Sequence, residues 1–102
     1  MKFRIEFSIS ATADAELIHE GIDVSSPQAA DRLLALFAAS ADSLSEFPKR
    51  YPLAPESRWH SEEVRHMFVG NYRMLYMIRG ETVFIARIRH AAQRPFKPGE
   101  LN

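Results

Sequence analysis

Histidine and arginine are the side chains through which this chain could move protons or hold anions, because it contains no cysteine. His60 and His66 are six residues apart, which does not match the i, i+4 spacing of paired helical metal ligands, so neither a metal nor a cofactor is expected. His90 stands beside Arg89 and Arg94 at the end of an apolar run, where it could act as a general acid or base in a ribonuclease. Alternatively, His90 only ends a strand and forms a hydrogen bond there.

The basic residues are concentrated in the second half of the chain. Residues 1–47 contain three basic and eight acidic residues, a net charge of −5, whereas residues 48–102 contain ten basic and five acidic residues, a net charge of +5. Eight of those ten are arginines, which pair bidentately with carboxylates and phosphates. The second half is therefore expected to contact an anionic partner, unless the two halves neutralise each other within the fold.

The size of the chain predicts one domain over residues 1–102, because 102 residues with 46% hydrophobic positions do not suffice for two cores. No stretch approaches the roughly 20 consecutive apolar residues that span a bilayer. Residues 1–10 alternate polar and apolar side chains and so lack the apolar segment of a secretory signal. We therefore expect a cytoplasmic protein that does not contact a membrane.

The first elements that position these side chains are a strand and two helices. Strict alternation of apolar and polar residues over residues 2–9 predicts a half-buried strand. Ser10 or Thr12 can cap a first helix, whose apolar residues repeat at helical spacing up to about Val24. Pro27 suits the first turn of a second helix, which continues to residues 47–48. The two helices are expected to form an antiparallel hairpin.

The second half predicts strands. Three β-rich runs, at residues 64–69, 72–78 and 81–90, are separated by the two-residue turn signals Gly70-Asn71 and Arg79-Gly80. Their order predicts a three-stranded antiparallel meander, so the fold class is α+β. Residues 49–63 contain proline and serine without a regular period and predict a loop. Residues 91–102 predict an irregular, frayed tail.

The strands of the meander are apolar on both sides, yet a helical hairpin can cover only one face of a four-stranded sheet. The uncovered face is expected to dock a partner, because a contiguous exposed apolar surface usually marks a binding site. Which arginines share that face depends on hairpin register and stays open. The alternatives are a strongly twisted sheet with scattered exposed apolar residues, or a dimer. The residues expected at the docking face are Arg65, Met67, Arg73, Leu75, Met77, Val83, Ile85, Arg87 and Arg89, with Arg94 at its border.

Several short segments of the sequence, in their order and spacing, resemble the ParE/RelE toxin superfamily of type II toxin–antitoxin systems, and its ParE-like branch in particular. The resemblance covers essentially the whole chain. Its sharpest signals are the Tyr72-Arg73 pair in the central strand and the Arg89-His90 pair after the last strand. The segments are Phe47-Pro48-Lys49-Arg50, Pro52-Leu53-Ala54-Pro55-Glu56, Val64-Arg65, Val69-Gly70-Asn71-Tyr72-Arg73-Met74-Leu75-Tyr76 and Ile88-Arg89-His90-Ala91-Ala92-Gln93-Arg94-Pro95.

The resemblance implies a toxin neutralised by a cognate antitoxin, whose C-terminal segment orders as it wraps the toxin in a hetero-oligomer. ParE-like members inhibit DNA gyrase, whereas RelE-like members cleave messenger RNA on the ribosome. If the chain is such a nuclease, the resemblance and the His90 argument give Arg73, Arg89, His90 and Arg94 as its candidate catalytic residues. A third possibility is a degenerate, non-toxic binding module.

The nuclease pattern is incomplete in this sequence. The two lysines that the pattern has upstream of Arg73 fall on Val64 and His66, and its second arginine falls on Gln93, one position from Arg94. The C-terminal tyrosine of the nucleases has no counterpart. The side chains that usually stabilise the pentacovalent phosphate and protonate the leaving oxygen are therefore missing. The resemblance therefore favours a toxin that inhibits gyrase and is not an enzyme.

Overall fold

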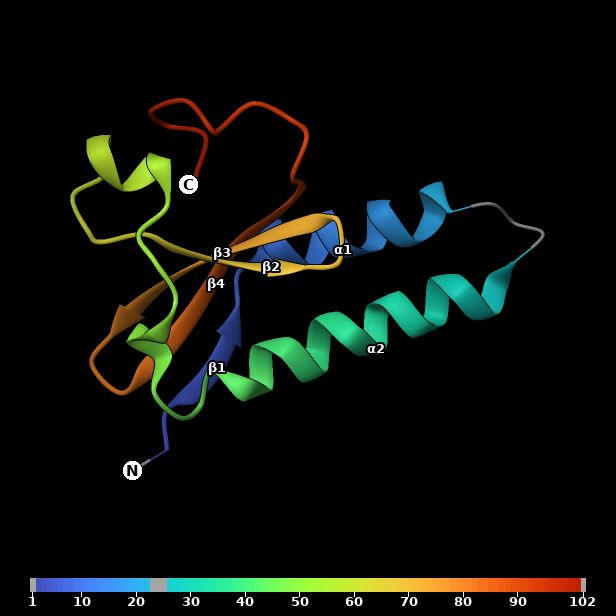
Figure 1. Ribbon diagram of the computed structural model, residues 1–102, viewed down its shortest axis with the longest axis horizontal. Helices are drawn as coiled ribbons and strands as arrows, with labels where there is room; N and C mark the ends of the chain where they lie inside the picture. The colour runs from blue at the N-terminus through green and yellow to red at the C-terminus, as the bar shows by residue number, and fades with distance from the viewer. Residues whose placement is uncertain (1, 23–25, 102) are drawn as a thin grey trace.

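A computed structural model describes residues 2–22 and 26–101 (Figure 1). Within these residues there are four strands, two α-helices and two short 3₁₀ helices, so the predicted α+β fold is confirmed. In chain order they are β1 (Arg4–Phe7), α1 (Ile9–Gly21), α2 (Pro27–Ser43), η1 (Pro48–Arg50), η2 (Pro55–Trp59), β2 (Arg65–Val69), β3 (Tyr72–Arg79) and β4 (Thr82–His90).

The four strands form one mixed sheet in the order β1-β4-β3-β2. β2, β3 and β4 are the predicted antiparallel meander, with Val69 opposite Tyr72 across the first turn. β1 lies parallel to β4 at the edge, with Ile5 opposite Val83. Because a parallel neighbour needs a long crossover, the helical hairpin and the meander together connect β1 to β4.

The helical hairpin covers one face of the sheet, as predicted. Phe37 of α2 packs edge-on against Tyr72 of β3, with ring centroids 5.6 Å apart. Buried apolar side chains from both layers form a continuous core between them. Its buried members are Ala11, Phe37, Ala41, Leu44, Met67, Val69, Met74, Tyr76, Val83, Ile85 and Ile88.

The helix boundaries differ from those expected. α1 begins at Ile9, because the Ser8 side chain caps it by accepting the N–H of Ala11 at 2.9 Å; Ser10 and Thr12 lie inside the helix. The predicted end near Val24 lies outside the described residues. α2 begins at Pro27 as predicted but ends at Ser43, where a tighter turn starts as the N–H of Leu44 bonds to Ala41. The segment between Ser43 and residue 47 is therefore a turn.

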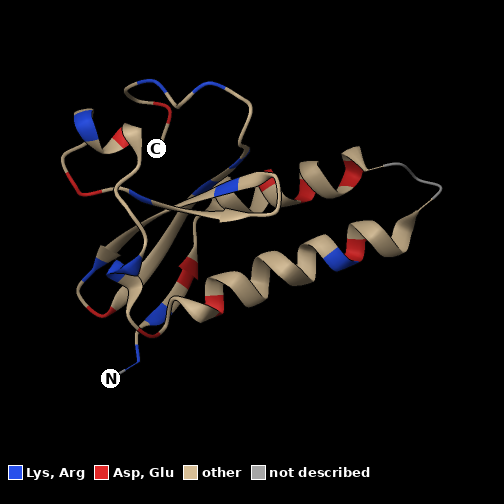
Figure 2. Ribbon diagram, viewed as in Figure 1, with Lys and Arg blue, Asp and Glu red and all other residues tan. Residues whose placement is uncertain are grey.

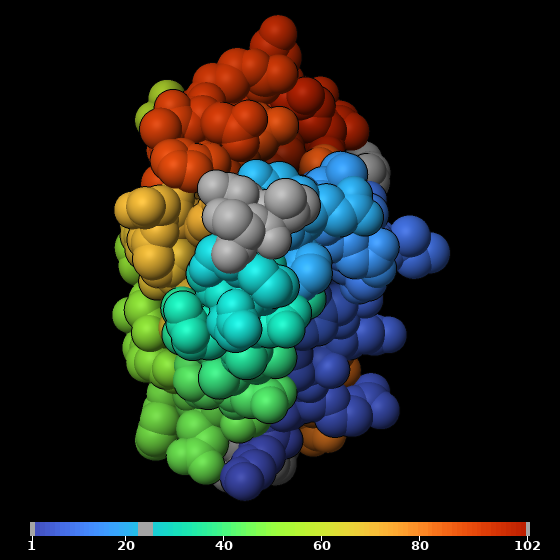
Figure 3. Space-filling view, turned by 90° about the vertical axis from the view of Figure 1, so that its right-hand side faces the viewer, coloured from blue at the N-terminus to red at the C-terminus, as the bar shows by residue number. Residues whose placement is uncertain are grey.

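The C-terminal tail covers the middle of the second sheet face, so the expectation that this whole face is open is wrong; Phe68, opposite Arg73 on the same face, stays 58% exposed. Phe96 and Leu101 are 1% and 7% exposed and pack with Leu75 and Met77 of β3. Figure 3 shows the tail, in red, forming the top of the molecule above the two helices. The tail is irregular as predicted, but it is not frayed, because its two apolar side chains complete a second core. That core consists of Ala54, Val64, Leu75, Met77, Ala86, Phe96 and Leu101.

Three residues expected at the docking face also lie elsewhere. Met67, Val83 and Ile85 point toward the helices and are at most 8% exposed. The reason is the register: their neighbours along each strand point to the opposite face. These side chains therefore stabilise the core between helices and sheet.

Acidic residues lie on both α-helices, on β1 and in the loops, whereas most basic residues lie on the sheet and tail (Figure 2). Among the arginine ion pairs of the described residues, the pair of Arg87 with Asp14 joins the two halves of the chain. The remaining four pairs each form within the second half. The two halves therefore neutralise each other only in small part. None of the helices in the described part of the chain is both long and apolar enough to cross a membrane.

Candidate functional site

Arg73 lies at the centre of the sheet face that the tail covers. Its side chain is only 6% exposed and forms a bidentate ion pair with Glu56 of η2, which is fully buried. The two N–O distances are 2.7 and 3.1 Å. The same guanidinium lies 3.1 Å from Nδ1 of His66. Two opposite charges thus neutralise each other beneath the tail, in a geometry that suits a guanidinium and a carboxylate.

Glu56 also holds the tail. Its Oε2 atom accepts the backbone N–H of Phe96 at 2.8 Å. Burial raises the pKa of Glu56, but the hydrogen bonds from Arg73 and Phe96 outweigh burial, so the pKa lies below its ordinary value. Sequence reasoning assigned no role to Glu56. Its only signal was a carboxylate directly after Pro55, between Arg50 and Arg58.

His66 is kept neutral by its surroundings. Burial and then the charge of Arg73 lower its pKa, and these two causes outweigh the opposing effect of Glu56. A neutral imidazole leaves Nδ1 free to accept a hydrogen bond from Arg73. His66 therefore extends the buried polar group to three side chains.

Arg87 and Arg89 clamp the tail from β4. Arg87 pairs with both carboxylate oxygens of Asp14 on α1, at 2.7 and 2.9 Å, and donates to the backbone oxygen of Glu100 at 2.8 Å. Arg89 donates to the backbone oxygen of Arg94 at 3.0 Å. Their guanidinium carbons lie 4.7 and 3.8 Å from the ring centroid of Phe96, in cation–π range. Both arginines are thereby occupied by the chain itself.

The four candidate nuclease residues do not converge on one open site. Arg73 and Arg89 are opposite each other on neighbouring strands, but Arg73 is buried and the Phe96 ring packs against Arg89. His90 points to the helical face, where its ring lies 5.3 Å from that of Tyr72. Its Nδ1 accepts the N–H of Ala92 at 3.0 Å, which is the hydrogen-bonded strand end that was the alternative interpretation.

Arg94 belongs to the tail and pairs with Glu100 at 2.9 Å. The hydrogen bond from Arg94 is the main cause that lowers the pKa of Glu100 to about 2. This pair lies at the surface and closes the tail on itself. Arg94 is therefore turned toward its own segment.

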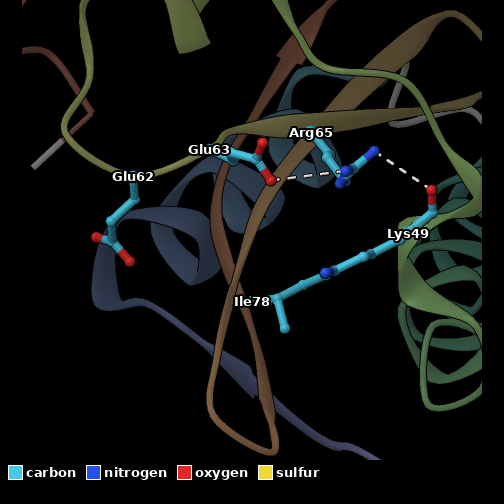
Figure 4. Close-up of a pocket in the computed structure, with 5 residues that line it drawn as sticks. All are labelled: Lys49, Glu62, Glu63, Arg65 and Ile78. Carbon is cyan, nitrogen blue, oxygen red and sulfur yellow. Dashed lines mark hydrogen bonds and ion pairs between the residues drawn. The ribbon is translucent and has the colours of Figure 1, made fainter.

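Arg65 lies apart from the other arginines, at the first position of β2. It donates to the backbone oxygens of Tyr51 and Lys49 at 2.7 and 3.3 Å, and it lies 3.6 Å from Glu63. Figure 4 shows the pocket beside it, where the Lys49 side chain extends toward Ile78. Arg65 thus fixes the loop before β2 to the sheet.

The outer side of α1 and the edge of β1 present apolar side chains to solvent. Ile9 is 92% exposed and Leu17 is 66% exposed, and their spacing places them on one side of the helix. Phe7 on β1 is 36% exposed. A groove of about 500 Å³ runs beside Phe7 and Ile9, with Met77 and Phe84 among its lining residues. This surface, defined by Phe7, Ile9 and Leu17, is called the α1 stripe below.

Phe47, between α2 and η1, combines exposure with backbone strain. It has a φ of 50° and is 80% exposed. For a residue with a Cβ atom, the left-handed conformation costs roughly 1–2 kcal/mol. Sequence reasoning took this residue only as a helix end, because a side chain gives little sign of its φ angle.

Within residues 2–22 and 26–101, no three histidine or carboxylate side chains lie close enough together to hold a metal ion. The charged groups on the covered face are instead arranged in pairs. What the arrangement offers is a surface with an apolar stripe and several exposed aromatic rings, of which Phe47 is the most exposed.

Comparison with known proteins identifies the family. A model described as the ParE toxin of type II toxin–antitoxin systems, parDE, matches residues 5–95. The chain is 37% identical over 84 residues to Toxin RelE2 of Caulobacter vibrioides, across 81% of this chain and 89% of the relative.

Two solved structures share the fold. The chromosomal ParDE system from P. aeruginosa is similar with a TM-score of 0.72 and 15% identity, covering 87% of this chain and 96% of that one. The RelBE2 toxin–antitoxin complex from Mycobacterium tuberculosis is similar with a TM-score of 0.64 and 28% identity, covering 91% and 95%. The family model spans most of the sequence, and the chain therefore belongs to the ParE toxin family of type II toxin–antitoxin systems.

Proposed function

We propose that this chain is a toxin that arrests growth by binding DNA gyrase, without cleaving RNA, and that a cognate antitoxin neutralises it. The observation that carries the first part is the burial of Arg73 in its ion pair with Glu56. Cleavage of a phosphodiester needs cations that reach the scissile phosphate. Arg73, Arg87 and Arg89 are instead bound to carboxylates, backbone oxygens and the Phe96 ring.

The family model supports the gyrase target, since ParE-like toxins, which the sequence resembles, inhibit gyrase. Inhibition of a large enzyme by binding needs a rigid, shaped surface and no catalytic group of its own. The two packed faces of the sheet and the clamped tail supply that rigidity. Substitution of a residue that holds the tail, such as Arg87 or Arg89, should therefore reduce gyrase inhibition only to the extent that it unfolds the chain.

The α1 stripe is the proposed antitoxin site. The similar structures from P. aeruginosa and Mycobacterium tuberculosis are described as toxin–antitoxin systems or complexes, which supports a partner protein for this chain as well. An amphipathic segment could cover Ile9 and Leu17, whose exposure is otherwise unfavourable, and Phe7 at the sheet edge. Leu75 and Met77, which the tail already covers, are not part of this proposed site.

Ribosome-dependent cleavage of messenger RNA is the second candidate, because the 37% identical relative is named RelE2. That activity would need the tail to leave Arg73 and Arg89, so that both could reach a phosphate. It would also need another group in place of the missing tyrosine. The covered state of these arginines weighs against it.

Two assays with purified toxin separate the candidates. The gyrase proposal predicts that supercoiling of relaxed plasmid by gyrase falls as toxin is added, while messenger RNA in translating ribosomes stays intact. Cleavage of that RNA, abolished by Arg73→Lys, would instead support the nuclease. Normal supercoiling, intact RNA and harmless expression without a partner would leave only a non-toxic binding module.

A further inference from the structure

Phe47 is an exposed aromatic residue held in the left-handed backbone conformation, which a residue with a Cβ atom adopts only at a cost. Among the described residues other than glycine, it alone has a positive φ. A turn that needed only this backbone geometry would be better served by glycine or asparagine, and a ring needed for packing would be buried. Neither explains a ring that is 80% exposed. Strain that the rest of a structure maintains is concentrated at functional sites.

The turn around Phe47 is fixed from the solvent side by Arg50. Its guanidinium donates to the backbone oxygens of Ser43, Glu46 and Phe47, at 3.2, 2.6 and 3.2 Å. These carbonyls lie at and just after the C-terminal end of α2, where a cation is favoured. Arg50 therefore ties η1, which follows Phe47, to the turn that precedes it.

The same turn is fixed from the core. The hydroxyl of Tyr76, which is fully buried, donates to the backbone oxygen of Pro48 at 2.5 Å. Pro48 is itself buried and starts η1. Phe47 thus stands between two anchored residues and is presented to solvent with little freedom to lose. Such preorganisation lowers the entropic cost of binding.

The charges near Phe47 indicate what it binds. Lys2, Glu46 and Phe47 line one depression of about 390 Å³, and Lys49, two residues after Phe47, lines a second pocket beside Arg65. Neither lysine forms an ion pair with any residue that the structure describes. A partner with carboxylates around an apolar pocket would satisfy both lysines and the ring.

A nucleic acid fits this surface less well than a protein does. Glu46 lines the same depression as Phe47, and the chain has no net charge. Binding to a phosphate backbone depends on concentrated positive charge. Phe47 and the α1 stripe also lie at opposite ends of β1, because Phe3 pairs with Ser45 before the strand, whereas α1 follows it. Phe47 is therefore free to contact a protein other than the antitoxin.

We propose that Phe47 is the anchor by which the chain grips its protein target, with the ring in an apolar pocket of that target and Lys2 and Lys49 opposite carboxylates on the rim. This inference rests on the proposed function, because it takes the inhibited protein to be the occupant. It adds the residue that carries the contact. Aromatic side chains in such pockets commonly dominate binding.

The test replaces Phe47 with residues that tolerate its backbone. Phe47→Asn and Phe47→Gly should leave the fold intact and raise the melting temperature, because strain is removed. The same variants should bind immobilised DNA gyrase at least about tenfold more weakly than wild type. Leu36→Ala, which removes a half-exposed apolar side chain from α2, is the matched control and should change affinity less than about twofold.

Three outcomes would overturn the inference. Phe47→Asn could bind gyrase and arrest growth like wild type, or it could lose stability and binding together, which would make the ring structural. It could also lose binding to a labelled single-stranded RNA 20-mer while gyrase binding persists. If wild type itself does not bind gyrase, the proposed function fails, and growth arrest on expression becomes the readout. Loss of arrest in a stabilised Phe47→Asn protein, with RNA binding unchanged, would then still support a protein-binding anchor.

Discussion

Arg73 and Glu56 form a buried bidentate ion pair, with Nη2 and Oε2 2.7 Å apart. The pair joins the central strand β3 to η2, and through the N–H of Phe96 it also holds the tail. The arginine that resembles a nuclease residue therefore has a structural partner in this chain. Because Arg73 is buried, it cannot reach the phosphate of an RNA, and this favours gyrase binding over RNA cleavage.

Removing the carboxylate should destabilise the chain strongly. Glu56→Ala leaves the charge of Arg73 buried without a partner, which costs about 3–5 kcal/mol. Urea unfolding measures the loss. The control is Glu62→Ala, whose pair with Arg79 is about half exposed and should contribute at most about 1 kcal/mol. Equal, small effects of both substitutions would contradict the role given to the buried pair.

His66 should make stability depend on pH in the weakly acidic range. Its folded pKa lies below the ordinary value of 6.5, so the unfolded chain binds a proton more readily than the folded one. The free energy of unfolding should therefore be highest above about pH 6.5 and fall as the pH drops below that value toward the folded pKa. Urea unfolding at pH 7.5 and 5.5 measures the fall.

His66→Gln is the matched variant for this pH dependence, because an amide can still accept a hydrogen bond from Arg73 but does not titrate. The variant should lose less stability than wild type between the two pH values. An identical loss in both proteins would show that another group causes the dependence.

Phe96 should hold the tail against the sheet. Phe96→Ala removes a ring that is 1% exposed and stacks under Arg87 and Arg89, so it should cost about 3–5 kcal/mol. The tail should then become a site of rapid proteolysis. Phe68→Ala, which truncates a ring that is 58% exposed, should cost about 1 kcal/mol or less. A tail that stays resistant to protease in Phe96→Ala would contradict its description as an anchored segment.

The α1 stripe should be needed for neutralisation. Leu17→Glu puts a charge into the proposed antitoxin contact and should weaken the complex at least about tenfold, with the melting temperature nearly unchanged, since Leu17 is 66% exposed. Copurification with the co-expressed antitoxin measures the complex. Leu36→Glu on α2 is the control. Equal copurification of Leu17→Glu and wild type would place the antitoxin elsewhere.

Local pattern predicted the strands and the two α-helices, but not the 3₁₀ helices η1 and η2, which fall in the segment predicted as a loop. Alternation located the strands, Pro27 located the start of α2, and Gly70-Asn71 located the first hairpin turn. These signals act between near neighbours in the chain. The helical hairpin on one face followed from its apolar residues alone.

The arrangement of the arginines could not be predicted in the same way, because a bulge changes the parity of β4. Tyr76 is opposite Ile85 but Leu75 is opposite Arg87, so Ala86 is an extra residue. Before the bulge Val83 and Ile85 face the helices, and after it Ile88 does. Nothing in the sequence marks Ala86 as the place where this happens.

The cover of the second face was missed for a related reason. Phe96 and Leu101 are isolated apolar residues in a segment with two prolines, and they show no period. Phe96 is held by Glu56, Arg87 and Arg89, which come from other elements. Contacts between distant segments fix the tail, so the surface left for partners became visible only in three dimensions.

Gyrase supercoiling measured with purified toxin is the most direct test of the proposed function. Wild-type toxin should inhibit supercoiling in a dose-dependent manner, and an equimolar amount of cognate antitoxin should restore it. Supercoiling that is indifferent to toxin, together with messenger RNA cut on translating ribosomes, would contradict the proposed function.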